Sequence, residues 1–159
     1  MTEISSRPID QLTRRELLQL GNQVKEKLSP SELVTWSIEL LVASATATRQ
    51  ISEVEELIES GKNHNQWFQA QSIFSSIRSL TLMEEKKIRQ DPIYLAVLYL
   101  AENTAKVVYN ASGGDAPFDD DAIDWIPVCV HELYKSTKSR KLKLELERKL
   151  FSGSGGHSI

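Results

Sequence analysis

Five aspartates lie within ten residues of the chain, and no other cluster of side chains suggests chemistry as readily. Residues 115–124 contain these five carboxylates and no basic residue. Carboxylate oxygens bind hard divalent cations, and a cluster of them attracts basic protein partners. The pattern lacks EF-hand spacing, so a docking surface is the favoured interpretation, and we predict neither a metal nor a cofactor. A divalent-metal-dependent enzyme that uses this loop is kept as an alternative.

The candidate residues of this docking surface are four of the aspartates and a neighbouring tryptophan: Asp119, Asp120, Asp121, Asp124 and Trp125. An aromatic side chain ringed by charge is typical of a binding hot spot. A structural explanation also exists, because aspartates favour the N-terminal cap and the first turn of a helix. The residue types alone do not separate these two interpretations.

A basic stretch follows the acidic one. Residues 135–149 hold seven lysines and arginines against two glutamates. Five of them are candidate contacts to nucleic-acid phosphates: Lys135, Lys138, Arg140, Lys141 and Lys143. The stretch lacks interleaved aromatic residues and the whole chain has a net charge of −3, so a helical subunit of a nucleic-acid complex ranks second. The opposite charges also predict that the two segments pair, either within one chain or between two copies.

No other grouping of residues predicts catalysis. His131 and Glu132 begin the signature of a zinc protease, but Lys135 occupies the position of its second histidine. Cys129 has apolar neighbours, which favour a buried and unreactive thiol. The sequence therefore predicts a non-enzymatic helical protein–protein interaction module: an adaptor, a complex subunit or an immunity-type neutralising partner. The expected partner is another protein or a second copy of this chain.

Local sequence signals predict helices along most of the chain. Thr13 and Ser29 each precede a glutamate by three residues, which is the spacing of a capping box. Asp91 is followed by a proline, a combination that favours the start of a helix. The residues that follow are apolar on nearly every side of the expected helix, which predicts a buried central helix over about 92–111.

The boundaries of three further segments depend on weaker signals. The helix that starts at Ser29 either continues to residue 60 or breaks near Ser52. Asp124 is the expected N-cap of the next helix, which would place Pro127 at its third position. Residues 140–151 alternate apolar and polar side chains as a strand does. They are helix formers without a β-branched residue, however, so we predict a helix.

Length and composition fit one folded domain. The chain has 159 residues, of which 40% are hydrophobic and 26% charged. The single cysteine excludes an internal disulfide and favours a reducing compartment, and neither a signal peptide nor a bilayer-spanning run is recognisable. We therefore expect a cytoplasmic, all-α protein without membrane association. The expected domain is a single bundle of about five to six helices over residues 1–151, followed by a flexible Gly/Ser tail over 152–159.

Overall fold

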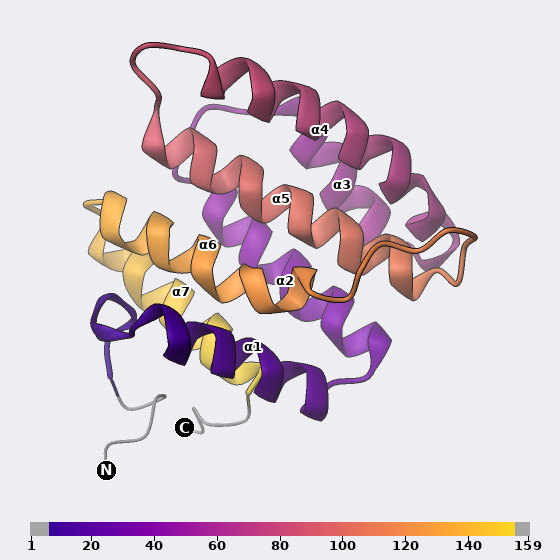
Figure 1. Cartoon of the computed structure of the whole chain (residues 1–159), viewed down its shortest axis with the longest axis horizontal. Helices are drawn as coiled ribbons and strands as arrows, with labels where there is room; N and C mark the ends of the chain where they lie inside the picture. The colour runs from indigo at the N-terminus through magenta and orange to yellow at the C-terminus, as the bar shows by residue number, and fades with distance from the viewer. Residues whose placement is uncertain (1–6, 155–159) are drawn as a thin grey trace.

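The computed structural model of the protein describes residues 7–154. Within these residues it contains seven α-helices, two short 3-10 helices and no strand (Figure 1). The α-helices are α1 (Arg14–Lys27), α2 (Pro30–Ala45), α3 (Ser52–Lys62), α4 (Ala70–Glu85), α5 (Pro92–Ala111), α6 (Ala122–Ser136) and α7 (Arg140–Ser152). The 3-10 helices are η2 (Ile9–Gln11) and η3 (His64–Gln69). None of these helices is long and apolar enough to cross a lipid bilayer.

The all-α class is confirmed, but the described part of the chain has seven α-helices rather than five or six. Of the two expectations for the helix that starts at Ser29, the break near Ser52 is confirmed, because α2 ends at Ala45 and a separate helix, α3, begins at Ser52. In the turn between them the Thr46 hydroxyl donates a hydrogen bond to the Ala43 carbonyl oxygen, at 2.7 Å. Threonine has a low helix propensity, and a hydroxyl that bonds to the last carbonyl groups of a helix favours an end to the helix at this point.

The predicted helix starts with strong local signals are confirmed. Thr13 and Ser29 each form a complete capping box with the glutamate three residues later. The Asp91 carboxylate accepts hydrogen bonds from the backbone N–H groups of Ile93 and Tyr94, both at 3.1 Å. Each cap satisfies N–H groups that the first helical turn leaves without a partner.

The predicted start of α6 is wrong. The helix begins at Ala122, and Pro127 lies inside it as its sixth residue rather than at the third position. Asp124 does not cap the helix, because its carboxylate is engaged across the interface with α1. Lys25 Nζ lies 3.1 Å from both carboxylate oxygens of Asp124. A contact between residues so far apart in sequence overrides the local capping preference.

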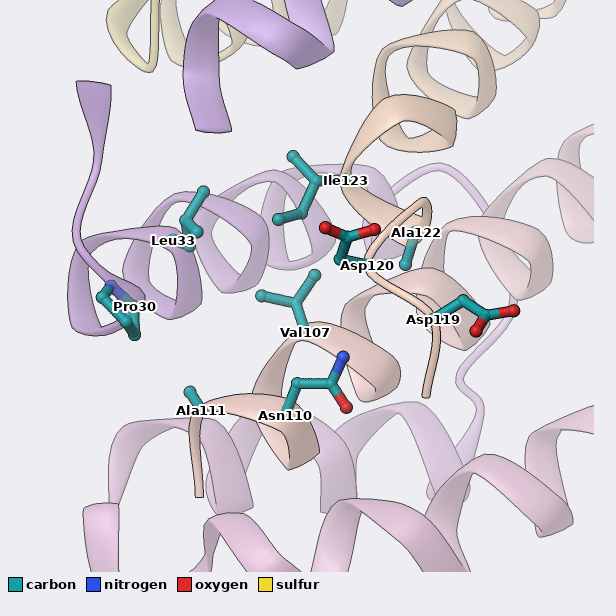
Figure 2. A pocket seen from close by; sticks show the side chains of 9 residues that line it. All are labelled: Pro30, Leu33, Val107, Asn110, Ala111, Asp119, Asp120, Ala122 and Ile123. Carbon is teal, nitrogen blue, oxygen red and sulfur yellow. The ribbon is translucent and has the colours of Figure 1, made fainter. Parts of the chain in front are cut away.

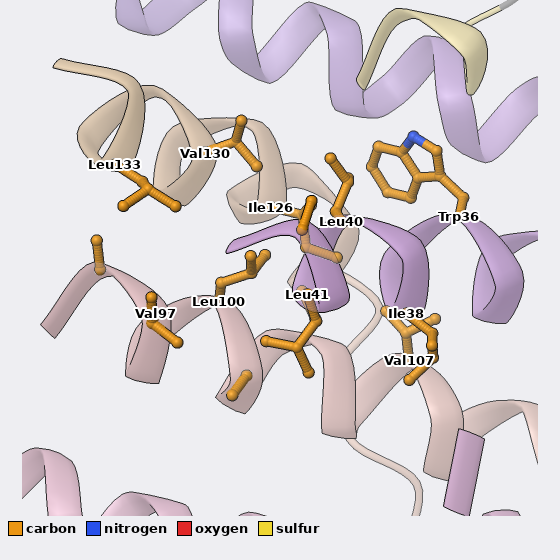
Figure 3. Packing of buried hydrophobic residues seen from close by; sticks show 14 of the residues in the cluster. Trp36, Ile38, Leu40, Leu41, Val97, Leu100, Val107, Ile126, Val130 and Leu133 are labelled. Atoms are coloured by element: carbon orange, nitrogen blue, oxygen red, sulfur yellow. The ribbon is translucent and has the colours of Figure 1, made fainter. Parts of the chain in front are cut away.

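The predicted central helix is confirmed as α5. It packs against α2, α4 and α6, and 13 of its 20 residues are buried. Figure 3 shows its side chains, among them Val97, Leu100 and Val107, interleaved with those of α2 and α6. Burial of α5 on several sides explains why its sequence is apolar nearly all round.

The first residues of the expected tail belong to the packed structure. Ser152 is the last residue of α7, while Gly153 and Ser154 are buried. Trp36 Nε1 donates a hydrogen bond to the Leu150 carbonyl oxygen at 3.3 Å, and a Cβ atom at Gly153 would overlap the Trp36 ring. Glycine therefore lets the end of α7 lie directly against the indole. Residues 155–159 of the expected tail lie outside the described residues.

Candidate docking site beside the acidic loop

The acidic loop connects α5 to α6 and is fastened to the end of α5 by one side chain. Asn110 Nδ2 donates to the Phe118 carbonyl oxygen at 2.9 Å, and Asn110 Oδ1 accepts from the Phe118 N–H at 2.8 Å. The amide of Asn110 thus pairs with both polar backbone groups of Phe118. This double hydrogen bond fixes the loop immediately before Asp119 and Asp120.

Aromatic packing also holds Phe118 in place through its side chain. The Phe118 ring lies 4.9 Å from the Phe74 ring and 5.7 Å from the Tyr109 ring, measured between centroids. The Tyr109 hydroxyl donates a hydrogen bond to the Asp115 carbonyl oxygen. These contacts attach the loop to α4 and α5, so the aspartates are carried on a positioned segment.

A hollow of about 160 Å³ lies between the loop, α2, α5 and the first turn of α6 (Figure 2). Six apolar residues line it: Pro30, Leu33, Val107, Ala111, Ala122 and Ile123. The polar lining residues are Asn110, Asp119 and Asp120. In Figure 2 the Asp120 carboxylate points toward Ile123, whereas the Asp119 carboxylate points outward. The hollow therefore has an apolar interior and a negatively charged rim.

The two rim carboxylates are free to receive a cation. Asp119 and Asp120 are both exposed. In the part of the chain that the structure describes, neither of them has an ion-pair partner. A group that approaches the hollow with positive charge would meet carboxylates that need not first be released from another contact.

The remaining predicted docking residues point elsewhere. Asp121 is exposed before α6 and does not line the hollow. Asp124 is held by Lys25, as described above. Trp125 is 39% exposed, and the Arg14 guanidinium lies 5.6 Å from its ring centroid on the α1 side of α6. The structure thus brings two of the five predicted residues, Asp119 and Asp120, to one site.

Comparison with known proteins adds nothing to this geometry. No protein-family model, no curated protein and no solved structure matches the chain.

Sequence reasoning missed the residues that form the interior of the hollow. Leu33, Val107 and Ile123 have the types and spacing of ordinary core residues, and most of each side chain is indeed buried. Asn110 carried no signal other than its position at the end of the apolar helix. Only the fold shows that α2, α5 and α6 leave a gap between these side chains.

The predicted nucleic-acid contacts lie at the other end of α6, in the segment after it and in α7. Lys135 pairs with Glu132 at 3.3 Å, and Lys143 Nζ lies 5.3 Å from the centroid of the Tyr134 ring. The other three residues, Lys138, Arg140 and Lys141, are exposed. Their binding to phosphates stays a prediction.

The acidic loop and the basic stretch do not pair within the chain. No ion pair joins residues 115–124 to residues 135–149 in the described structure. The acidic side is held through Lys25 of α1, and the basic side through Glu132 of α6 and Glu39 of α2. Pairing of the acidic loop of one copy with the basic stretch of another copy stays a prediction.

The acidic loop does not present a set of ligands for a metal ion. Within residues 7–154, no group of three or more His, Cys, Asp or Glu side chains is arranged to hold a metal ion. The aspartates of the loop instead point in different directions, with Asp124 turned toward α1 and Asp119 toward solvent.

A second polar cluster, between α4 and α5, contains the buried Glu102. Its carboxylate accepts a hydrogen bond from the Thr81 hydroxyl at 2.5 Å and lies 3.3 Å from the Arg78 guanidinium. Burial nevertheless raises the pKa of Glu102 above its ordinary value, since the loss of water outweighs these favourable contacts. The Cys129 thiol lies nearby, 3.7 Å from Asn103 Nδ2, and burial raises its pKa to about 12. This thiol is therefore protonated at neutral pH, although Cys129 as a whole is only partly buried.

The raised pKa of Glu102 predicts a pH dependence of stability. A carboxyl whose pKa is higher in the folded state holds its proton more firmly there than in the unfolded chain, so stability falls as the pH rises through the raised pKa. We expect the Glu102→Gln variant to lack this component and to show a flatter stability profile between about pH 4 and 8. Urea unfolding across that range checks it, with the exposed Glu56→Gln as the matched control. A variant profile parallel to that of the unmodified protein would contradict the assignment.

Proposed function

We propose that the protein is a non-enzymatic interaction module, and that its hollow receives an apolar side chain of a partner protein flanked by basic residues. The observation that supports this is the combination of an apolar interior with two exposed carboxylates that have no partner in the described structure. An adaptor, a complex subunit and an immunity-type neutralising partner all act through a surface of this kind.

The size and lining of the hollow favour a branched aliphatic or small aromatic side chain. Its volume of about 160 Å³ is close to that of the apolar cavities, roughly 150 Å³, that admit a benzene ring. Burial of one such side chain contributes about 1.5–3 kcal/mol, whereas an exposed ion pair contributes about 0–1 kcal/mol. The apolar interior would therefore supply most of the affinity, and Asp119 and Asp120 would supply selectivity and a faster association.

The two alternatives have less support from the geometry. A metal-dependent enzyme would need further ligands beside Asp119 and Asp120. The lining of the hollow includes no third carboxylate, histidine or cysteine, and residues 7–154 contain no group of three such side chains arranged to hold a metal ion. The basic residues of α7 have no hollow or aromatic platform described beside them except Tyr134. A cytoplasmic location is part of the proposal, since the single cysteine cannot form an internal disulfide.

A peptide titration tests the hollow directly. We expect a short peptide with one leucine between lysines to bind, and the same peptide with glutamates in place of lysines not to bind. Replacement of both rim carboxylates, Asp119→Asn with Asp120→Asn, should weaken binding about tenfold at low salt. The measurement is the shift of the backbone amide signals of Val107 and Ala122 in an NMR titration.

Two further variants make the titration specific. Asp115→Asn with Asp121→Asn removes the same charge from the same loop but leaves the lining of the hollow intact, so binding should change little. Ala111→Leu keeps every charge but fills the hollow, so binding should be lost. If the two double variants weaken binding equally, the site is a diffuse acidic surface and the proposed hollow is wrong.

A further inference from the structure

The turn between α4 and α5 carries the most exposed large apolar side chain of residues 7–154. Ile88 is 104% exposed, more than an isoleucine in an extended chain. Met83, at the end of α4, is 65% exposed as well. A side chain with no neighbour on its own molecule gains most from burial against another surface.

The surroundings of Ile88 are positively charged on their outer side. Lys86 and Arg89 are exposed, and in the described structure neither forms an ion pair. The two glutamates that precede them are turned inward. Glu84 is buried and accepts hydrogen bonds from the Asp91 N–H at 2.8 Å, while Lys87 Nζ lies 2.9 Å from it. Glu85 accepts a hydrogen bond from the Tyr99 hydroxyl.

The inward position of Glu84 leaves the charge of the turn unbalanced. The hydrogen bond from the Asp91 N–H, together with Lys87 and Arg49, keeps the pKa of Glu84 below its ordinary value, so this carboxylate stays ionised and committed to its own partners. The face that the turn presents to solvent is therefore an isoleucine between two free cations. This is the ligand chemistry that the hollow beside the acidic loop is proposed to accept.

We infer that the occupant of the hollow is Ile88 of a second copy of this chain, with Lys86 and Arg89 beside Asp119 and Asp120. The inference rests on the proposed function, and it names the partner. The turn and the hollow lie at opposite ends of α5 (Figure 1). With 20 residues, this helix is about 30 Å long, so a chain cannot place its own Ile88 in its own hollow.

The positions of the two surfaces define the type of assembly. Each copy offers one turn and one hollow, and the two are different patches of the surface. The contact therefore joins two unlike patches, and it produces a two-fold pair that makes the contact twice, a larger closed ring or an open chain of molecules. It differs from the between-copy charge pairing predicted from the sequence, in which residues 135–149 are the basic side, because here the α4–α5 turn supplies the basic residues.

Leu144 of α7 is the rival apolar side chain, and it fits less well. It is 66% exposed and has Arg140 and Arg148 one helical turn away on either side. It lies on the flank of a helix, however, and Glu145 follows it directly in the sequence. A turn can enter a concave site more deeply than a helix flank can.

Sedimentation velocity over a concentration series at low salt tests the inference. The unmodified chain should form species larger than a monomer, and these should dissociate at high salt. Ile88→Asp should raise the dissociation constant of self-association more than about tenfold. Because Ile88 contacts nothing in its own molecule, this variant should fold normally. Asp119→Lys with Asp120→Lys should have the same effect from the other side of the contact.

A mixing experiment separates a contact between these two unlike patches from one in which a patch meets the same patch of the other copy. The Ile88→Asp chain keeps its hollow, and the Asp119→Lys with Asp120→Lys chain keeps its turn. Each alone should be a monomer, and an equimolar mixture should form a 1:1 complex and nothing larger. The inference is overturned if the unmodified chain stays monomeric, if Ile88→Asp associates unchanged, or if Leu144→Asp abolishes association in its place.

The peptide titration distinguishes a failure of this inference from a failure of the proposed function. The lysine–leucine peptide should bind the monomeric Ile88→Asp chain, because its hollow is intact. If the peptide binds at Val107 and Ala122 but the unmodified chain does not self-associate, the hollow serves a different protein and only the second-copy inference falls. If the peptide does not bind and the unmodified chain does not self-associate, the second-copy inference and the proposed function are both wrong.

Discussion

A leucine in place of Gly21 is expected to lower the free energy of unfolding by about 3 kcal/mol. A Cβ atom at this position of α1 would lie 2.7 Å from Asp124 Cα and 3.0 Å from the Ile123 carbonyl oxygen. Both neighbours are backbone atoms, so the clash can be relieved only if α1 and α6 move apart. That movement would stretch the Lys25–Asp124 contact and shift the first turn of α6, which carries one side of the hollow.

Two companion variants make the Gly21 prediction testable by urea unfolding. Gly21→Ala should cost less, about 1–2 kcal/mol, since alanine regains up to about 1 kcal/mol of helix propensity. Asn22→Leu introduces the same side chain at the next residue, which is exposed, and should leave the unfolding midpoint nearly unchanged. A leucine variant at Gly21 with the stability of the unmodified protein would show that the two helices do not approach so closely.

Removal of the Asn110 side chain is expected to have the second-largest effect, because it releases the acidic loop. Asn110→Ala leaves the Phe118 N–H and carbonyl groups without their partners. We expect a loss of about 2 kcal/mol in the free energy of unfolding. We also expect exchange of the Phe118 amide hydrogen to accelerate at least about tenfold. Peptide binding at the hollow should weaken in parallel, since the loop carries Asp119 and Asp120.

An aspartate at the same position provides the control. Asn110→Asp keeps an acceptor for the Phe118 N–H but places an ionised oxygen against the Phe118 carbonyl. Protonation restores a donor, so this variant should regain stability as the pH falls, whereas Asn110→Ala should not. Asn22→Asp tests the effect of the charge alone on an exposed site. Equal behaviour of the two Asn110 variants at low pH would argue against the double hydrogen bond.

The parts of the fold that could be predicted are those that neighbouring residues determine. Thr13, Ser29 and Asp91 each act on N–H groups within three residues of themselves, so sequence alone identified three helix starts. The start of α6 depends on Lys25, which is 99 residues from Asp124 in the chain. No local pattern contains that information, and the preference of Asp124 for a capping position gave the wrong boundary.

The candidate site divides in the same way. Its charge was predictable, because the aspartates are consecutive in the sequence and Asp119 and Asp120 are exposed. Its apolar interior was not, since Leu33, Val107 and Ile123 come from three helices and their sequence patterns match a filled core. Trp125 shares a helix with Ile123 but packs beside Arg14 of α1. Its role as a binding anchor stays a prediction.

The hydrogen bond between Trp36 and Leu150 has a consequence for how the chain matures in the cell. Its partners are 114 residues apart. At a synthesis rate of roughly 5–20 residues per second, a ribosome makes Leu150 roughly 6–23 seconds after Trp36. During that interval the indole and the surface of α2 beneath α7 have nothing to cover them. This surface therefore stays uncovered on the growing chain until α7 has left the ribosome and packed against α2.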